Sequence, residues 1–402
     1  RRSLLDGIIM GTFSAQSFLF DFLGVVMNAI YLWLPAITIF SAWKFWLYYI
    51  RLRNIENINW VLLEIKLPRE ITKSPGAMEM ILNTIHQTRD GSAVLKLWEG
   101  FQRVWFSLEI ASFGGMIHFY IYTQKGFKSL VEHQIYAQYP GIEIEEVEDY
   151  TKNIFTHNDV DKFYSAEFAL EKEDAYPIKT YIDYGLDKLQ NEEEQKNDPM
   201  TSLLEFMGSL KKSEQVWFQV MIRATKSKKW KESGKALVDK IMKRDKEKDS
   251  AEMVNFASLA ISPGERLQVE AIERNISKIG FDVCIRTAYF AGKDDYRGAA
   301  RGILTGLMKQ YNSTNLNGFK LINATSYVDY FFPETRHNWR KKRMFDAYVK
   351  RGAFYAPFTR KLFVLNTEEL ATIYHFPGSV AKTPTISRIE SKKGEPPTAL
   401  PI

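Results

Sequence analysis

The stretch VWFSLEIASFGGMIHFYIYT, residues 104–123, decides the fold, because it reads as two alternating strands around a turn at Gly114-Gly115. The apolar residues that alternate along the two strands are Val104, Phe106, Leu108 and Ile110, followed by Ile117, Phe119 and Ile121. Such a period of two predicts a β-hairpin with one face turned toward a core.

The segments on either side of this hairpin extend the pattern. NWVLLEIKLP (59–68) predicts a strand, and Ser74-Pro75 is a good start for the helix that follows it. After the hairpin, residues 125–141 predict a helix and IEIEEVEDY (142–150) a strand. The order strand, helix, strand, strand, helix, strand is typical of a ferredoxin-like βαββαβ domain, which we expect over residues 59–150.

A second domain with the same element order is expected over residues 160–325. Its predicted strands include 163–170, 213–225 and 281–290, and a helical stripe follows from Ala300 to Tyr311. Two further helical stretches, 229–244 and 263–278, are interpreted as a helical insertion. The sequence thus predicts an α+β protein with two ferredoxin-like domains.

Two segments complete the C-terminal part. Residues 326–377 predict a mixed, basic segment of helix and strand. Residues 378–402 hold four prolines and little apolar periodicity, which indicates an extended linker.

The N-terminal part contains the most apolar stretch, YLWLPAITIFSAWKFWLYYI (31–50), in which Lys44 is the single charge. Its length predicts a transmembrane helix at 25–50, and Pro35 is tolerated in membrane helices. A buried core helix and a signal peptide are the alternatives, and both are usually shorter. Residues 1–24 are amphipathic or weakly apolar and suit an interfacial helix or the first half of a hairpin.

Aromatic and basic residues flank that stretch. The expected membrane-anchor residues are Trp33, Pro35, Trp43, Trp46, Tyr48, Tyr49, Arg51 and Arg53. Aromatic residues favour the headgroup region, and the arginines favour the cytoplasmic side. The sequence therefore predicts a lipid bilayer as partner, and a location at the cell membrane with the remaining chain facing the cytoplasm.

Composition limits the function classes. The 402 residues carry a net charge of +6, with a pI near 9.0 and one cysteine, Cys284. Two or three domains without a disulfide framework fit these values, and a mildly basic chain permits nucleic acid or anionic lipid as partner.

No sequence motif for catalysis is present. The chain lacks G-x-x-x-x-G-K-[ST], G-x-G-x-x-G, H-E-x-x-H and G-x-S-x-G, and its six histidines are scattered. The acidic run from Glu143 to Asp149 lies on one strand and its exit, which indicates a solvated surface. We therefore predict no catalytic residue, cofactor or metal site.

Two basic clusters are candidate contacts for nucleic acid or an acidic partner. The first is Lys226, Lys228, Lys229 and Lys231; the second is Arg336, Trp339, Arg340, Lys341, Lys342 and Arg343. Contact with phosphates is one interpretation, and a solvated helix face is the other. Exposed sheet aromatics would add base stacking, and the residues expected on outer strand faces are Trp105, Tyr120, Tyr122 and Trp217.

Several stretches together carry a family resemblance, among them NWVLLEIKLPREITKSPGAMEMIL, WFSLEIASFGGMIHFYI, EQVWFQVMIRA, LNTEELATIYHFP and SRIESKKGEPPTALP. The sequence resembles the region ahead of the motor domain in membrane-anchored ATPases related to type IV secretion and conjugation, of the kind common in small-genome candidate-phylum bacteria. The resemblance covers most of residues 50–402.

This resemblance implies a non-catalytic scaffold that positions a DNA-pumping P-loop motor, with ATPase activity requiring a P-loop domain beyond Ile402. It also implies a cyclic homo-oligomer, for which six subunits is one option, and DNA as a candidate partner. The alternative function is a membrane-tethered nucleic-acid-binding protein that uses the basic clusters and sheet aromatics.

Overall fold

The computed structural model describes residues 30–68, 71, 73–153, 163–187, 197–242, 261–292, 295–326 and 331–378, together with residues 20, 22, 24 and 27. Most of the predicted N-terminal segment 1–24, the middle of the predicted insertion and the predicted linker after Gly378 therefore lie outside the described residues.

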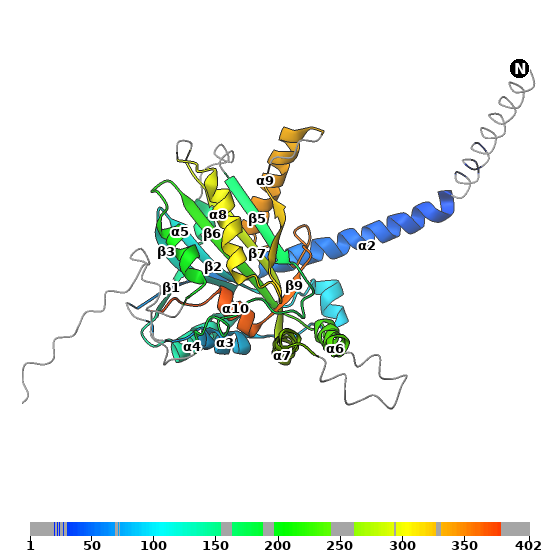
Figure 1. Cartoon of the computed structure of the whole chain (residues 1–402). Coiled ribbons are helices and arrows are strands. Elements are labelled where there is room, and N and C mark those ends of the chain that lie inside the picture. The colour runs from blue at the N-terminus through cyan, green and yellow to red at the C-terminus, as the bar shows by residue number, and fades with distance from the viewer. Residues whose placement is uncertain are drawn as a thin grey trace, which may run out of the picture. The chain divides into compact units, whose positions relative to one another are not determined.

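The central feature is one antiparallel sheet of nine strands (Figure 1). Its strand order is β4-β1-β3-β2-β6-β7-β5-β8, and β9 pairs with β7. The strands are β1 (Trp60–Lys66), β2 (Phe106–Phe113), β3 (Met116–Gln124), β4 (Glu143–Val147), β5 (Phe163–Leu170), β6 (Gln215–Ala224), β7 (Gly280–Phe290), β8 (Phe319–Ala324) and β9 (Phe363–Asn366).

Helices connect the strands and cover the sheet. The α-helices are α2 (Ile30–Asn57), α3 (Gly76–Ile85), α4 (Lys128–Gln138), α5 (Met200–Gly208), α6 (Lys229–Ile241), α7 (Pro263–Ser277), α8 (Ala299–Leu307), α9 (Pro333–Val349) and α10 (Thr367–Ile373). The short helices are η1 (Leu95–Glu99), η2 (Lys125–Phe127), η3 (Tyr150–Asn153) and η8 (Met308–Tyr311).

The prediction of two ferredoxin-like domains is wrong, because strands of both predicted domains belong to the same sheet. β2 pairs with β6 over eight residues, from Phe106↔Ile222 to Phe113↔Gln215. One apolar core also runs beneath both halves, from Leu63 of β1 to Ile285 of β7. The protein is therefore a mixed α+β fold built on a single continuous sheet.

The predicted hairpin at its centre is confirmed. β2 and β3 pair from Ser107↔Tyr122 to Phe113↔Met116. Gly114 and Gly115 form the turn with φ angles of 58° and 93°, a region that side-chain-bearing residues rarely adopt. The backbone of Lys212 also lies 3.1 Å from where a Cβ of Gly114 would stand. Glycine at this turn therefore permits the positive φ angles of the hairpin and leaves room for the backbone of Lys212.

The two faces of the sheet are covered differently. On one face, side chains of α3, α4, α5, α8 and α10 pack onto the strands and form the large core. On the other face, Met344 and Tyr348 of α9 pack onto aromatic residues that include Trp217 and Phe290. Both faces are thus buried, which explains why the central strands lack a clear polar side.

The segment from β9 to α10 lies inside this core rather than on its surface. β9 pairs with Gly280–Val283 of β7, just beyond the point where β5 leaves that strand. All seven residues of α10 are buried. Asn366 caps the helix, because its side-chain oxygen accepts a hydrogen bond from the Glu369 backbone N–H, and the Glu369 side chain accepts one from the Asn366 backbone N–H.

The chain divides into two compact units, Arg1–Asn57 with Gly91–Gln102, and Ile58–Asp90 with Arg103–Ile402. In the first, the Nε1 of Trp46 on α2 donates to the Leu97 carbonyl at 3.4 Å, and its ring lies 6.3 Å from that of Trp98. Gly100 has a φ of 69°, and a Cβ there would stand 2.3 Å from the Ile50 carbonyl oxygen. Only glycine lets η1 pass α2 so closely.

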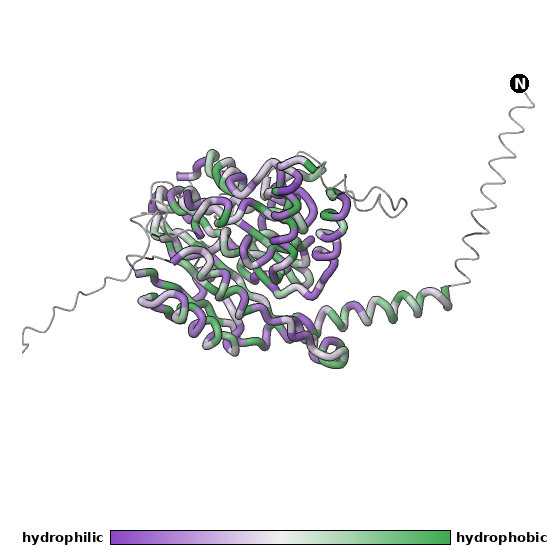
Figure 2. Tube along the Cα trace, turned by 60° about the horizontal axis from the view of Figure 1, so that its bottom comes forward, coloured by the Kyte–Doolittle hydropathy of each residue, from purple (hydrophilic) through white to green (hydrophobic). Residues whose placement is uncertain are grey.

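α2 is a continuous helix of 28 residues with Pro35 inside it. Among the described residues, no helix combines the length and the apolar character that crossing a bilayer requires. This finding contradicts the predicted transmembrane helix at 25–50 and the membrane location inferred from it. Thr38, Ser41 and Lys44 interrupt the apolar residues along α2 (Figure 2), and the indole and phenol groups of its aromatic residues are themselves polar.

The expected anchor residues all lie on α2 and are exposed. Trp33, Trp43, Trp46, Tyr48 and Tyr49 expose between 37% and 55% of their surface. Pro35, Arg51 and Arg53 are exposed as well. These residues lie together on one helix, as expected. Their predicted contact with a membrane is not supported, because α2 does not combine the length and apolar character needed to cross a bilayer.

Candidate functional site

The first basic cluster surrounds a pocket of about 570 Å³ in the second unit. Lys226 and Lys228 lie in the loop between β6 and α6, and Lys231 and Lys235 lie on the first two turns of α6. All four line the pocket, whereas Lys229 is exposed beside it. Three of the four predicted lysines therefore converge on one cavity, and Lys235 joins them.

The loop that carries these lysines is held by its own hydroxyl groups. The Thr225 backbone donates to the Gly280 carbonyl at 3.2 Å, which fixes the loop at the end of β6. The Thr225 hydroxyl oxygen accepts from the Ser227 backbone at 3.3 Å, and the Ser227 hydroxyl oxygen accepts from the Lys229 backbone at 3.3 Å. Among the described residues neither hydroxyl donates a hydrogen bond, so each proton is available to an anion.

Trp230, Gly280 and His86 form the inner wall of the pocket. Trp230 is 5% exposed, and a Cβ at Gly280 would stand 2.9 Å from its ring. The Nε2 of His86 donates to the Gly280 carbonyl at 3.0 Å, because that oxygen can only accept. Burial, and secondarily Lys231, lowers the pKa of His86. The histidine is therefore neutral at pH 7 and adds no charge to the pocket.

The pocket has a positive charge that internal ion pairs only partly balance. Asp90 pairs with Lys226 at 3.1 Å, and Glu232 is the acidic residue among the pocket's lining. Within the part of the chain that the structure describes, Lys228 and Lys235 make no ion pair. Burial, followed by repulsion from Lys235, lowers the pKa of Lys231. Four lysines against two carboxylates leave a net of two positive charges, which suits an anionic ligand.

The second predicted cluster lies on α9. Trp339 is 62% exposed, and the Arg343 guanidinium stands 5.1 Å from its ring centre. Arg336 and Lys342 are exposed, and Arg340 donates to the Ala324 carbonyl at 3.4 Å. Lys341 is only 5% exposed, so it is not a surface contact.

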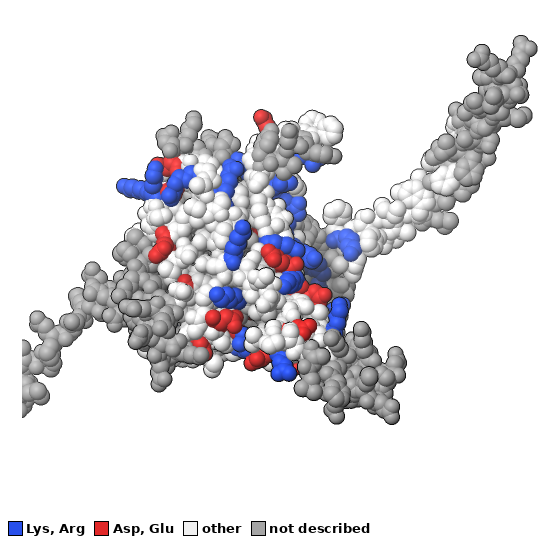
Figure 3. Space-filling view, viewed as in Figure 1, with Lys and Arg blue, Asp and Glu red and all other residues white. Residues whose placement is uncertain are grey.

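The two clusters do not form one patch. The pocket lies where β6 ends and β7 begins, whereas α9 packs on the other end of β7, with Phe345 6.2 Å from Phe290 (Figure 1). The eleven residues of β7 separate them, a length of roughly 35 Å at the rise of a strand. On the face shown in Figure 3, basic and acidic residues are interspersed. On that face, phosphate binding would therefore depend on local groups of side chains rather than on a broad basic field.

The sheet aromatics expected to stack on bases are not available for it. Trp105, Tyr120 and Trp217 are at most 5% exposed, since α9 and the loop after it cover that face of the sheet. Tyr122 is half-buried and stacks on Trp60 at a centroid distance of 5.1 Å. The predicted base-stacking surface on the sheet is thus wrong.

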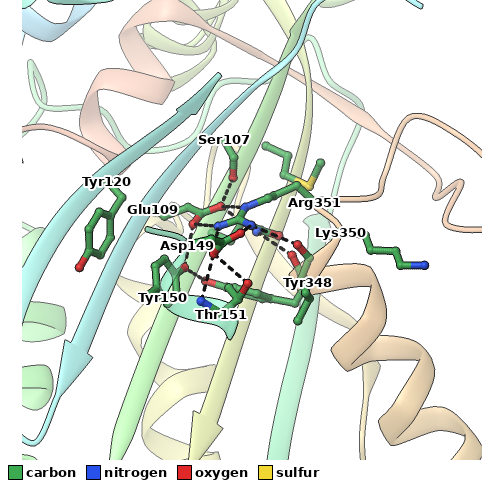
Figure 4. A network of polar contacts seen from close by, with 12 residues as sticks. Ser107, Glu109, Tyr120, Asp149, Tyr150, Thr151, Tyr348, Lys350 and Arg351 are labelled. Atoms are coloured by element: carbon green, nitrogen blue, oxygen red, sulfur yellow. Dashed lines mark hydrogen bonds and ion pairs between the residues drawn. The ribbon is translucent and has the colours of Figure 1, made fainter. Parts of the chain in front are cut away.

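A buried network of charges beneath α9 was not predicted (Figure 4). Arg351 follows α9 with a φ of 44°, and its side chain lies between Glu109 of β2 and Asp149, after β4. Its Nε is 3.0 Å from Glu109 Oε1, and its Nη2 is 3.0 Å from Asp149 Oδ1. Tyr150 donates to Glu109 at 2.7 Å. Since 242 residues separate Glu109 from Arg351, no local sequence pattern could have paired them.

A second buried arginine completes the attachment of α9. Arg286 of β7 pairs with Glu167 at 2.8 Å and donates to the carbonyls of Ala347 and Gly352. Arg360 also pairs with Glu167 at 3.0 Å. The arginines and carboxylates of these networks expose at most 19% of their side chains, so we interpret both networks as structural. Among the described residues no cluster of side chains could hold a metal ion.

Comparison with known proteins gives one family. The model of a domain of unknown function, DUF8128, matches residues 51–389. No curated protein matches the chain. The matched region contains every strand of the sheet, the pocket and α9. Because the match covers well over half of the sequence, the chain belongs to the DUF8128 family.

Proposed function

We propose that the protein is a non-catalytic platform that binds nucleic acid through the pocket between β6 and α6. The observation that carries this proposal is the convergence of Lys226, Lys228, Lys231 and Lys235 on a cavity of about 570 Å³. Lysine ammonium groups and the hydroxyls of Thr225 and Ser227 are groups that hold phosphate oxygens. The inner wall contains a neutral histidine and a buried tryptophan, and Glu232 is the acidic residue that lines the pocket, so the lysines outnumber the carboxylates there.

The sequence resemblance supports nucleic acid as the source of the phosphates. The chain resembles the region ahead of the motor in DNA-pumping ATPases, where a strand must be brought to the motor. In this proposal the sheet is a rigid support, the pocket holds the strand, and a P-loop ATPase domain or partner supplies the energy. Copies of the chain would assemble in a ring around the strand.

Replacement of one pocket lysine tests this function. We expect Lys235→Gln to weaken binding of a labelled single-stranded 20-mer, measured by fluorescence anisotropy across a salt series. One lost phosphate contact lowers the slope of log K against log salt by about 0.7 and the affinity by roughly threefold to tenfold at low salt.

Lys212→Gln is the matched control, because Lys212 is exposed and lies before β6, at the opposite end of that strand from the pocket. It removes the same charge and should leave both the slope and the affinity unchanged. If the wild-type protein does not bind the oligonucleotide at low salt, the proposed function is wrong.

A further inference from the structure

We infer that the pocket receives the phosphorylated end of a nucleic-acid strand, a phosphate monoester, rather than a phosphodiester within a strand. This inference rests on the proposed function and adds to it the class of ligand. It comes from the size of the pocket, its net charge and its hydrogen-bond donors, which together favour a terminal phosphate.

The first observation is that the pocket is walled by three separate segments. His86 and Thr88 follow α3, the lysines come from the β6–α6 loop and α6, and Ile276 to Gly280 belong to the junction of α7 and β7. A recess of about 570 Å³ has the size of a small-molecule site and suits one terminal nucleotide.

The second observation is the charge of the pocket. Four lysines, less Glu232 and the Asp90 that pairs with Lys226, leave two positive charges. A phosphodiester carries one negative charge, while a phosphate monoester carries about 1.5 to 2 at pH 7. The monoester therefore balances the pocket, and a diester leaves one lysine uncompensated.

The third observation is the supply of donors. The hydroxyls of Thr225 and Ser227 accept backbone hydrogen bonds, and within the described part of the chain neither donates one, so their protons are available to a ligand. Together with Lys228, Lys231 and Lys235 they supply five donor groups around the cavity, and a diester offers them two terminal oxygens. A monoester has three, and its higher charge makes each of those bonds stronger.

A bound anion would also reduce the repulsion between the lysines of the pocket. Burial and the neighbouring Lys235 lower the pKa of Lys231, so positive charge is crowded here in a partly desolvated site. A dianion relieves both the repulsion and the loss of hydration, more fully than a monoanion does.

The test compares oligonucleotides of one sequence that carry a 5′-phosphate, a 3′-phosphate or hydroxyls at both ends. We expect one phosphorylated form to bind about tenfold more tightly than the unphosphorylated form. In Lys228→Gln/Lys235→Gln this preference should disappear, and in Lys212→Gln it should persist.

Equal affinity for all three oligonucleotides would overturn the inference and leave the proposed function standing, whereas no binding to any of them removes both. Thymidine monophosphate, inorganic phosphate and vesicles of anionic phospholipid serve as competitors. If any of these displaces the phosphorylated oligonucleotide at a concentration equal to that of the oligonucleotide, the strand end is not the ligand. Weak competition, requiring a large excess, supports it.

Discussion

Replacing Arg351 by methionine should lower the free energy of unfolding by about 3–5 kcal/mol, the usual cost of leaving a buried carboxylate without its partner. Arg351 is 1% exposed, and Glu109, which it pairs with, is fully buried. Burial by itself raises the pKa of Asp149, yet Arg351 and the hydrogen bonds from Thr151 lower it overall. The arginine thus favours the ionised form of Asp149 and pairs with the buried Glu109, and methionine fills a similar volume without any charge. Urea unfolding followed by tryptophan fluorescence measures the change.

Two variants make this result interpretable. Arg343→Met removes an arginine from the exposed side of α9 and should change stability by less than about 0.5 kcal/mol. Adding Glu109→Gln to Arg351→Met should restore part of the loss, because the stranded charge is then gone. A free energy of unfolding of Arg351→Met within about 1 kcal/mol of the wild-type value would be close to the effect of an ordinary surface substitution. In that case the network does not hold α9 in place.

Raising the pH from 5.5 to 8 should destabilise the wild-type protein relative to Glu369→Gln by about 3 kcal/mol, at about 1.4 kcal/mol per pKa unit. Burial raises the pKa of Glu369 to about 8, although backbone hydrogen bonds from Asn366 and Ile178 oppose the shift. An unfolded glutamate has a pKa near 4.5. Between these values the folded state keeps a proton that the unfolded state has lost, so stability falls as pH rises.

The comparison with glutamine isolates this group, since glutamine resembles the protonated acid in shape and charge. The lowered pKa values of His86 and His337 act in the opposite direction near pH 6, but they act equally in both proteins. Glu273→Gln, on the exposed side of α7, should follow the wild type at every pH. Parallel stability curves for wild type and Glu369→Gln would mean that Glu369 titrates normally.

The elements of this fold were largely predictable from the sequence, and their assembly was not. β5 covers the predicted residues 163–170, and the hairpin turns at Gly114 and Gly115 as predicted. These features depend on local alternation and turn chemistry. The pairing of β2 with β6 joins strands about a hundred residues apart. The alternation of apolar residues within β2 or β6 does not identify the strand with which its edge will pair. The sequence therefore predicts two separate sheets where the structure has one.

The burial of acidic residues in the core could not be foreseen from the sequence. α10 carries Glu368 and Glu369, which usually indicate an exposed helix, yet both are 1% exposed. Glu368 is compensated by Lys278 at 2.9 Å and by the Thr180 hydroxyl at 2.5 Å. Those partners come from distant parts of the chain. From the sequence one expects that burying a carboxylate costs free energy, but the sequence does not show which residues will pair with that carboxylate and offset this cost.

In the candidate site, too, the local features could be predicted from the sequence and the contacts between distant segments could not. Three of its four lysines could be found in the sequence, because charge clusters are local. Its walls could not, since His86, Thr88 and Gly280 meet the lysines only through the fold. The covering of Trp105 and Trp217 by α9 was likewise invisible, because outer strand positions look alike whether solvent or a helix lies over them.

The position of β9 and α10 has a consequence for how the chain is made. Thr367 donates to Glu79 across 288 residues of sequence, and Tyr374 bonds to the Tyr120 carbonyl. During synthesis, the core around α3 and the central hairpin cannot be completed until β9 and α10 have been translated. Contacts of such long sequence separation slow folding. We expect the nascent chain to remain a client of chaperones until residues 363–376 have left the exit tunnel.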